Sequence, residues 1–273
     1  MPSGRSYERR IRAKRDAAKA ARRRAERMRK LRIAGSIVGA VAVAAVVAIV
    51  FLNKGSTKTA VQPTTSESPT PTSTPIAGCT VPSVAPTPNG KQFAKPPTMT
   101  IDTKKTYIAT MQTSCGEIKV TLDPKLAPAT VNNFVFLARQ GFFDGTFFHR
   151  VQNIPGDYAI VQGGDPQGTG MGGPGYKYNG ETPPKTASYT RGVIAMANSG
   201  SPSTNGSQFF FVVHSWPSLP KSYTIFGKAI DAVSLATLDR MIEAKGTDLG
   251  NGLGTAPDPR IYILKVTILE KKR

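Results

Sequence analysis

Apolar and polar residues alternate with a period of two through much of the chain beyond residue 99. Residues 107–111 and 117–122 show this alternation, which is typical of half-buried strands, and residues 114–116 between them predict a turn. Aromatic and branched residues predict further strands at residues 207–213, 223–228 and 260–269. The C-terminal part of the chain is therefore predicted to be mainly β.

Two segments of this part have helical periodicity instead. In the first, Pro128 can take the first helical position, and apolar residues follow at spacings of three or four from Val131 to Ala138. The second runs from about residue 232 to residue 244, with Gly246 beyond its end. Many strands with two helices predict a closed antiparallel barrel with helices at its ends.

The first 52 residues predict a membrane anchor. Residues 1–32 hold 14 Lys and Arg against 3 Asp and Glu, and residues 33–52 carry no charge. A helix of about 20 residues rises about 30 Å, the thickness of a bilayer's hydrocarbon core. The positive charge precedes this run, which predicts a cytoplasmic leader (1–32), a single-pass transmembrane helix (33–52) and an extracytoplasmic remainder at the cell membrane. A cleaved signal peptide is the alternative, but its apolar core would have about 7–15 residues.

The formal net charge of +19 is concentrated in this leader. Residues 99–273 hold 18 Lys and Arg against 13 Asp and Glu, so the predicted domain is only mildly cationic. A nucleic-acid-binding membrane protein is one interpretation of the basic leader. Topology and anionic lipid are a sufficient explanation, and we expect no nucleic acid partner.

Residues 53–98 predict a disordered spacer between the membrane and a domain of residues 99–273. Of these 46 residues, 9 are Pro and 15 are Ser or Thr. Such a segment buries too little apolar surface to offset the entropy of ordering it. Cys79 lies in this spacer and Cys115 early in the domain. An extracytoplasmic location permits a disulfide between them, and two free thiols are the alternative.

Two pairs of short blocks carry the candidate site. The first pair is FFHR at residues 147–150 and VQGGD at 161–165, and the second is MANSG at 196–200 and TNGSQFFF at 204–211. They place one arginine, two amides and several aromatic rings on strand-like segments, with no nucleophile, carboxylate pair or metal cluster nearby. This set suits a site that binds an extended peptide, and we expect neither a metal nor a cofactor.

Two other motifs have simpler interpretations. Residues 168–173 fit the pattern G-x-G-x-x-G, but Pro174 and Gly175 follow where a dinucleotide site requires a helix, so a tight loop is favoured. His149 and His214 lack partners at metal-ligand spacing. His149 is interpreted as a packed structural residue.

The blocks resemble those of the cyclophilins, the peptidyl-prolyl cis-trans isomerases, whose signatures read FHR…QGGD and MAN…NGSQFF. The match holds in order over residues 106–269. The resemblance implies a mainly β fold, a closed eight-stranded antiparallel barrel capped by two α-helices. It also implies isomerisation of X–Pro bonds in proline-containing polypeptides. With the predicted topology, we expect a monomer that assists the folding of extracytoplasmic proteins.

The resemblance assigns a role to nine residues. Arg150, at the third position of the FHR block, would be the essential arginine that stabilises the twisted X–Pro amide. The others would bind substrate: Ile160, Gln162, Phe210 and Leu219 in a proline pocket, Ala197, Asn198 and Gln208 in the adjoining groove, and Tyr223 at the position of the family's pocket histidine.

The chain departs from the family pattern beside this pocket. Ala159 stands where a pocket aromatic is expected, and Tyr158 is the candidate to replace it. A gap-free count places Ser218 at the family's pocket tryptophan, and Trp216 lies two residues earlier. That tryptophan is a common determinant of cyclosporin binding, so we expect weak inhibition. These changes keep an alternative open, a proline-peptide binding module or holdase with little turnover, which would tolerate the loss of Arg150.

Overall fold

The computed structural model describes residues 76–250 and 252–271. Its helices are α2 (Pro128–Arg139), α3 (Ala232–Met241) and the short 3-10 helix η1 (Pro202–Thr204). Its strands are β1 (Thr106–Thr113), β2 (Gly116–Leu122), β3 (Phe147–Phe148), β4 (Arg150–Asn153), β5 (Ala159–Gly163), β6 (Val193–Met196), β7 (Phe209–His214), β8 (Ile225–Ala229), β9 (Gly246–Asp248), β10 (Thr255–Pro257) and β11 (Ile261–Lys271).

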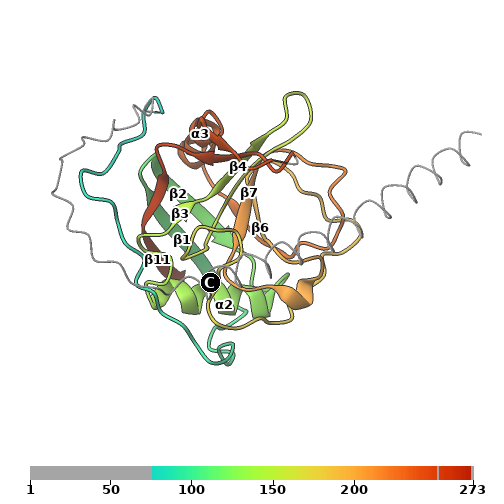
Figure 1. The fold of residues 1–273 in the computed structure, drawn as a ribbon. Coiled ribbons are helices and arrows are strands. Elements are labelled where there is room, and N and C mark those ends of the chain that lie inside the picture. Colours follow the sequence, from blue (N-terminus) through green and yellow to red (C-terminus); the bar gives the residue numbers. More distant parts are fainter. Residues whose placement is uncertain (1–75, 251, 272–273) are drawn as a thin grey trace, which may run out of the picture. The chain divides into compact units, whose positions relative to one another are not determined.

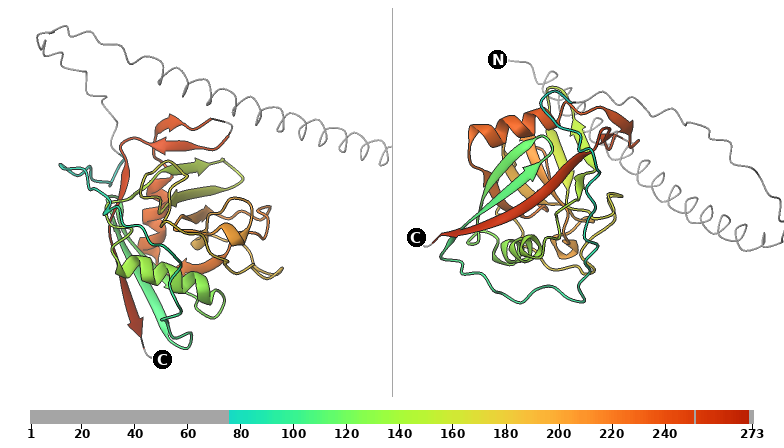
Figure 2. Two further views of the ribbon diagram at one scale, coloured as in Figure 1. Left: turned by 60° about the horizontal axis from the view of Figure 1, so that its bottom comes forward. Right: turned by 90° about the vertical axis from the view of Figure 1, so that its left-hand side faces the viewer.

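The strands form one antiparallel sheet in the order β3-β11-β1-β2-β8-β6-β7-β5-β4-β10-β9. The sheet curls around an apolar core, with α2 and α3 at its opposite ends (Figures 1 and 2). The prediction of a mainly β fold with two helices is confirmed. Both helices begin where the sequence places them, at Pro128 and Ala232, although α3 ends at Met241, three residues before the predicted end.

The predicted closed barrel of eight strands is wrong, because the sheet has eleven strands and its order runs from β3 to β9 without closing on itself. Two of the additional strands are the short hairpin of β9 and β10, which extends the sheet beyond β4. The third arises because His149 interrupts the strand that the FHR block forms. Phe147 and Phe148 pair with β11, whereas Arg150 begins a ladder with β5, so neighbouring residues bond to strands far apart in the sheet order.

The alternation of residues along β7 separates two apolar clusters. Phe209, Phe211 and Val213 belong to the large core inside the curl, which α2 covers with Phe134. Phe210 and Val212 point to the other face and join a smaller cluster. The core thus anchors one side of the strand and leaves the other side to form a site.

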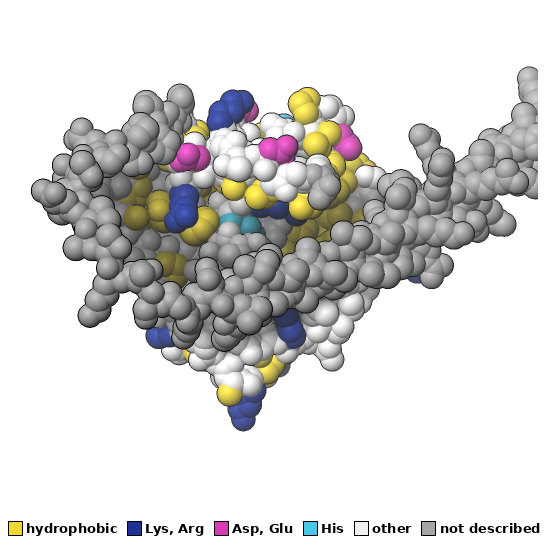
Figure 3. Space-filling model, viewed as in Figure 1, with side chains coloured by type: hydrophobic (Ala, Val, Ile, Leu, Met, Phe, Trp, Pro, Cys, Tyr) yellow, Lys and Arg dark blue, Asp and Glu magenta, His cyan; other side chains and the backbone are white. Residues whose placement is uncertain are grey.

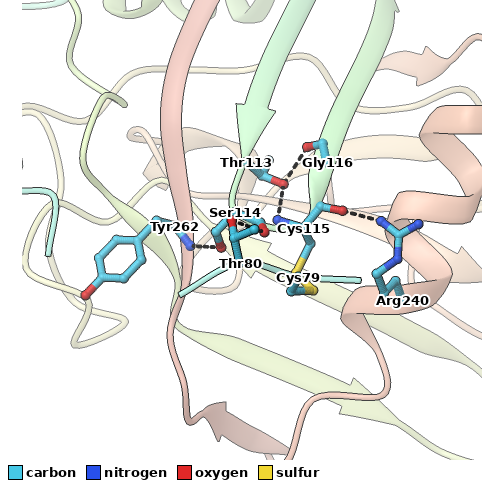
Figure 4. Close-up of a disulfide and its surroundings, with 8 residues drawn as sticks. All are labelled: Cys79, Thr80, Thr113, Ser114, Cys115, Gly116, Arg240 and Tyr262. Atoms are coloured by element: carbon cyan, nitrogen blue, oxygen red, sulfur yellow. Dashed lines mark hydrogen bonds between the residues drawn. A yellow bond between two sulfur atoms is a disulfide. The ribbon is translucent and has the colours of Figure 1, made fainter. Parts of the chain in front are cut away.

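A disulfide joins Cys79 to Cys115, so the alternative of two free thiols is wrong (Figure 4). Around it, Thr80 N donates to Ser114 O at 2.7 Å, and the Arg240 guanidinium of α3 donates to Cys115 O. Tyr262 N donates to the Ser114 hydroxyl at 3.0 Å. The bond therefore fastens residue 79 to the turn between β1 and β2.

Residues 76–98 form no helix or strand, but they pack along the domain from α3 to α2, and we call them the N-terminal strap. At its far end, Asn89 Nδ2 donates to Gly141 O at 2.7 Å. Phe93 N donates to Pro174 O at 2.8 Å, and its ring meets Phe136 edge-on with centroids 5.0 Å apart. These contacts extend the packed unit to the N-terminal side of residue 99, the boundary predicted from composition.

The predicted leader (1–32), the predicted membrane helix (33–52) and the spacer as far as residue 75 lie outside the described residues. Within residues 76–250 and 252–271, none of the helices combines the length and apolar character needed to span a bilayer.

Candidate active site

The pairing of four strands sets a row of predicted site residues across the outer face of the sheet. Arg150 of β4 lies opposite Gln162 of β5, which lies opposite Phe210 of β7. Phe210 in turn lies opposite Ala195 of β6. Residues that face each other in adjacent strands share a face of the sheet, so the register itself brings Arg150, Gln162 and Phe210 together.

Directed hydrogen bonds connect the polar members of this site. Arg150 Nη1 donates to Gln162 Oε1 at 3.2 Å, and Gln162 Nε2 donates to Gln208 Oε1 at 3.0 Å. Gln208 Nε2 then donates to Gly172 O at 2.9 Å, in the glycine-rich loop after β5. The glycine-rich motif thus belongs to the wall of the site. Since each amide uses both its oxygen and its nitrogen, the chain fixes the orientation of both glutamines.

The predicted proline pocket forms beside this chain. Ile160, Phe210 and Leu219 are all buried and belong to the smaller apolar cluster, which Ala197 and Tyr223 also contact. Tyr223 meets the Phe210 ring edge-on, with centroids 5.6 Å apart. We call Ile160, Phe210, Leu219 and Tyr223 the apolar pocket.

The predicted groove residues line a small cavity of about 180 Å³ next to the apolar pocket. Ala197, Asn198 and Gln208 share this cavity with Gln162 and with Lys177. The Asn198 side chain donates to Ser222 O at 2.8 Å, which holds it in place, and Ala197 N donates to Gln208 O at 2.9 Å. The structure therefore brings all nine predicted residues to one continuous face.

Two aromatic residues complete the edge of the apolar pocket. Tyr158 and Trp216 stack with centroids 3.6 Å apart and pack against the smaller cluster, while Ala159 lies in the large core. Tyr158, and not Ala159, thus packs against the cluster that contains the apolar pocket. Trp216 Nε1 donates to Ser218 Oγ at 3.1 Å. The weak cyclosporin inhibition inferred from Ser218 stays a prediction.

Burial lowers the pKa of two neighbouring side chains, Arg150 and His149. Desolvation lowers the pKa of the Arg150 guanidinium, with smaller opposing effects from Tyr158 and Tyr223. An arginine remains charged in spite of such a shift. Desolvation also lowers the pKa of His149, which is buried and whose ring nitrogens have no hydrogen-bond partner among the described residues. The His149 ring is therefore uncharged at neutral pH.

Sequence reasoning missed Gln152. This residue of β4 is buried, and its Oε1 accepts a hydrogen bond from Arg150 Nη2. A second missed contact is the carbonyl of Leu253, which accepts from Arg150 Nε. The period of two does place Gln152 on the face of Arg150, but the loop that meets both residues is about a hundred positions away in the sequence.

Charge is dispersed over the visible part of the face shown in Figure 3. Lysine and arginine side chains stand singly over the face seen in Figure 3, with acidic side chains near some of them. Two partly exposed ion pairs join Lys105 to Glu270 and Arg191 to Asp239. Residues 76–250 and 252–271 contain no group of three His, Cys, Asp or Glu side chains placed to hold a metal ion.

Residues 108–268 match the family model for the "Cyclophilin type peptidyl-prolyl cis-trans isomerase/CLD". The chain belongs to the cyclophilin family. This cyclophilin is 43% identical over 179 residues to "Peptidyl-prolyl cis-trans isomerase A" of Mycobacterium tuberculosis, covering 60% of this chain and 92% of that one. It is also 43% identical over 169 residues to "Probable peptidyl-prolyl cis-trans isomerase B" of the same species, covering 58% of this chain and 53% of that relative.

Solved cyclophilins agree with this assignment. A cyclophilin-type isomerase of Cryptosporidium parvum has a TM-score of 0.52 and 34% identity, covering 61% of this chain and 99% of its own. A second structure of that protein, determined in the presence of the dipeptide Ala-Pro, has a TM-score of 0.51 and 34% identity, covering 60% and 99%. Family and relatives together identify the enzyme as a peptidyl-prolyl cis-trans isomerase.

Proposed function

We propose that this cyclophilin isomerises X–Pro bonds with Arg150 as the hydrogen-bond donor to the twisted amide. The observation that carries the proposal is the chain from Arg150 through Gln162 to Gln208, which runs beside the buried residues of the apolar pocket. A guanidinium held next to an apolar pocket suits a ligand that presents a proline ring together with backbone carbonyls. The Ala-Pro dipeptide used with the Cryptosporidium protein is a ligand of that class.

The chemical task is to lower a torsional barrier of about 18–20 kcal/mol, which amide resonance creates. As the bond twists, the lone pair of the prolyl nitrogen becomes localised and can accept a hydrogen bond. A donor that meets this lone pair stabilises the transition state more than the planar ground state, and this difference accelerates the reaction.

Arg150 retains donors for this task. Its guanidinium has five N–H groups. Three of them point to Gln162, Gln152 and Leu253. One N–H on each terminal nitrogen has no acceptor among the described residues. In the proposed mechanism the apolar pocket holds the proline ring, Gln162 and the Asn198 backbone hold substrate carbonyls, and the residue before proline rotates.

We further propose that the enzyme acts outside the cytoplasmic membrane, tethered by residues 33–52, on polypeptides that refold after secretion. The charge difference across the apolar run supports this orientation. The disulfide supports an oxidising compartment, because such bonds persist there and are rare in the cytosol. All nine site residues come from one chain, so the proposal needs only a monomer.

The test is isomerisation of an Ala-Pro peptide, followed by a protease-coupled assay or by NMR exchange. Arg150→Ala separates the proposed enzyme mechanism from a holdase, because a binding module would keep both peptide affinity and its low turnover without the arginine.

A further inference from the structure

The loop before β10 approaches the site from the side opposite Gln162. Its carbonyls at Gly252 and Leu253 accept hydrogen bonds from Gln152 Nε2 and Arg150 Nε, respectively. Gln152 Oε1 also accepts a hydrogen bond from Arg150 Nη2. The Gln152 amide and the two carbonyls are thus joined by hydrogen bonds along one edge of the guanidinium. This set is separate from the chain that leads through Gln162 to Gln208.

The backbone of the hairpin is built for this close approach. Thr255 of β10 pairs with Val151 of β4, which lies between Arg150 and Gln152. Gly254 adopts φ +95°, and a Cβ there would lie 2.2 Å from Val151 O. A side chain at residue 254 would therefore push the hairpin away from β4. Glycine at this position brings the two carbonyls within reach of Arg150 and Gln152.

An arginine side chain is long and loses conformational entropy when it is fixed in one rotamer. If the protein fixes it before substrate binds, that cost does not add to the activation barrier. The hydrogen bond to Gln162 holds only the terminal nitrogen Nη1 of Arg150. By itself it would still allow the guanidinium plane to rotate about the bonds of the side chain. The bonds at Nε and Nη2 hold the opposite edge of the guanidinium plane, so the two sets together define its orientation.

We propose that Gln152, together with the carbonyls of Gly252 and Leu253, is a positioning device that orients Arg150 for isomerisation. The inference rests on the proposed role of Arg150 and extends it to a residue outside the signature blocks. Gln152 acts through Arg150 and does not touch the substrate.

The central variant is Gln152→Met, which keeps the length of the side chain and removes the amide. We expect kcat to fall about three- to tenfold with KM within about twofold of the unmodified enzyme, because orientation matters in the transition state more than in binding. Gln152→Glu restores an acceptor for Arg150 but not the donor to Gly252 O, and we expect an intermediate kcat. The control is Asn153→Leu, an exposed neighbour on the same strand, which should leave both constants unchanged.

A spectroscopic readout separates positioning from general stability. The Arg150 Nε–H signal in a ¹H–¹⁵N spectrum, assigned by its disappearance in Arg150→Lys, should shift and exchange faster with water in Gln152→Met. The remaining backbone signals should show that the variant is folded. A kcat equal to that of the unmodified enzyme, or an unchanged Arg150 signal, would overturn the inference.

The two proposals fail in different ways. If Arg150→Ala reduces kcat and Gln152→Met does not, the role of Arg150 stands and the positioning device is wrong. If Arg150→Ala retains the full rate, the proposed mechanism is wrong, and the positioning role of Gln152 is overturned with it.

Discussion

Gln162 donates from Nε2 to Oε1 of Gln208 at 3.0 Å. Gln162 Oε1 accepts a hydrogen bond from Arg150 Nη1, so this one amide connects Arg150, the proposed donor to the twisted X–Pro amide, to the groove residue Gln208. The connection depends on the amide having an acceptor at one end and a donor at the other. No apolar or purely acidic side chain of the same size provides both.

Replacing Gln162 should therefore lower kcat/KM, and by more when both of its hydrogen bonds are lost than when one is kept. Gln162→Leu removes both hydrogen bonds and should lower kcat/KM at least about tenfold, equivalent to about 1.4 kcal/mol of transition-state stabilisation. Gln162→Glu retains the acceptor for Arg150 and should lose less. Initial rates on an Ala-Pro peptide measure both. A Leu variant with the full kcat/KM would show that Gln162 contributes nothing to the transition state.

The N-terminal strap should stabilise the folded domain. We expect the fragment of residues 76–273 to exceed the fragment of residues 99–273 by about 2–4 kcal/mol in the free energy of unfolding, the typical contribution of a disulfide. Both fragments should fold, because the signature blocks and the helices lie beyond residue 99. Urea titrations of the two fragments measure the difference.

The same titration with a reducing agent isolates the disulfide from the strap's other contacts. Reduction should lower the stability of the longer fragment and leave the shorter one, which lacks Cys79, unchanged. Cys79→Ser in the longer fragment should reproduce the effect of reduction. Equal stability of the oxidised and reduced longer fragment would contradict the prediction.

His149 should make the stability of the domain depend on pH below neutrality. Burial lowers its pKa in the folded state from the ordinary value of 6.5. Below about pH 6.5 the unfolded chain binds a proton that the folded domain does not, so the free energy of unfolding falls as the pH decreases from 6.5 to the folded-state pKa. Above pH 6.5 His149 is neutral in both states and contributes no pH dependence.

Unfolding titrations at pH 7.5 and pH 5.5 test this expectation. His149→Gln should reduce the loss of stability between the two values. His214→Gln is the matched control, because His214 is exposed and should leave the loss unchanged. A His149 variant with the same pH dependence as the unmodified domain would show that this ring is not the titrating group.

The proposed topology predicts that the domain is accessible from outside the cell. Protease added to intact spheroplasts should release a folded, disulfide-containing fragment, since the Pro, Ser and Thr-rich residues before the strap are the expected cleavage site. A cytoplasmic protein serves as the control for membrane integrity. Protection of the domain until the membrane is lysed would invert the proposed orientation and remove secreted polypeptides as its substrates.

The sequence predicted those features that depend on local periodicity. Alternation located β1 and β2, because side-chain burial repeats every two residues in a half-buried strand. Aromatic and branched residues located β7, β8 and β11, and Pro128 marked the start of α2. The candidate site came from its sequence blocks and their resemblance to those of the cyclophilins. Gln162 and Phe210 reach one face because β5 and β7 pair in a register that their buried residues set.

Features that depend on contacts distant in sequence were not predictable. Gln152 carries no signal of its own, since its importance comes from a carbonyl about a hundred residues away. The strap reads as a spacer by composition, yet Phe93 and Asn89 have specific partners on α2 and on the loop after it. The strand interruption at His149 reflects two pairing partners, which only the folded sheet defines.

The most direct test of the proposed mechanism is the rate of cis-trans exchange of an Ala-Pro peptide with the unmodified enzyme and with Arg150→Ala. We predict that the unmodified enzyme accelerates exchange and that the variant, still folded by circular dichroism, has a kcat/KM at least about tenfold lower. A variant that retains the full rate would contradict the assignment of Arg150 as the donor to the twisted amide.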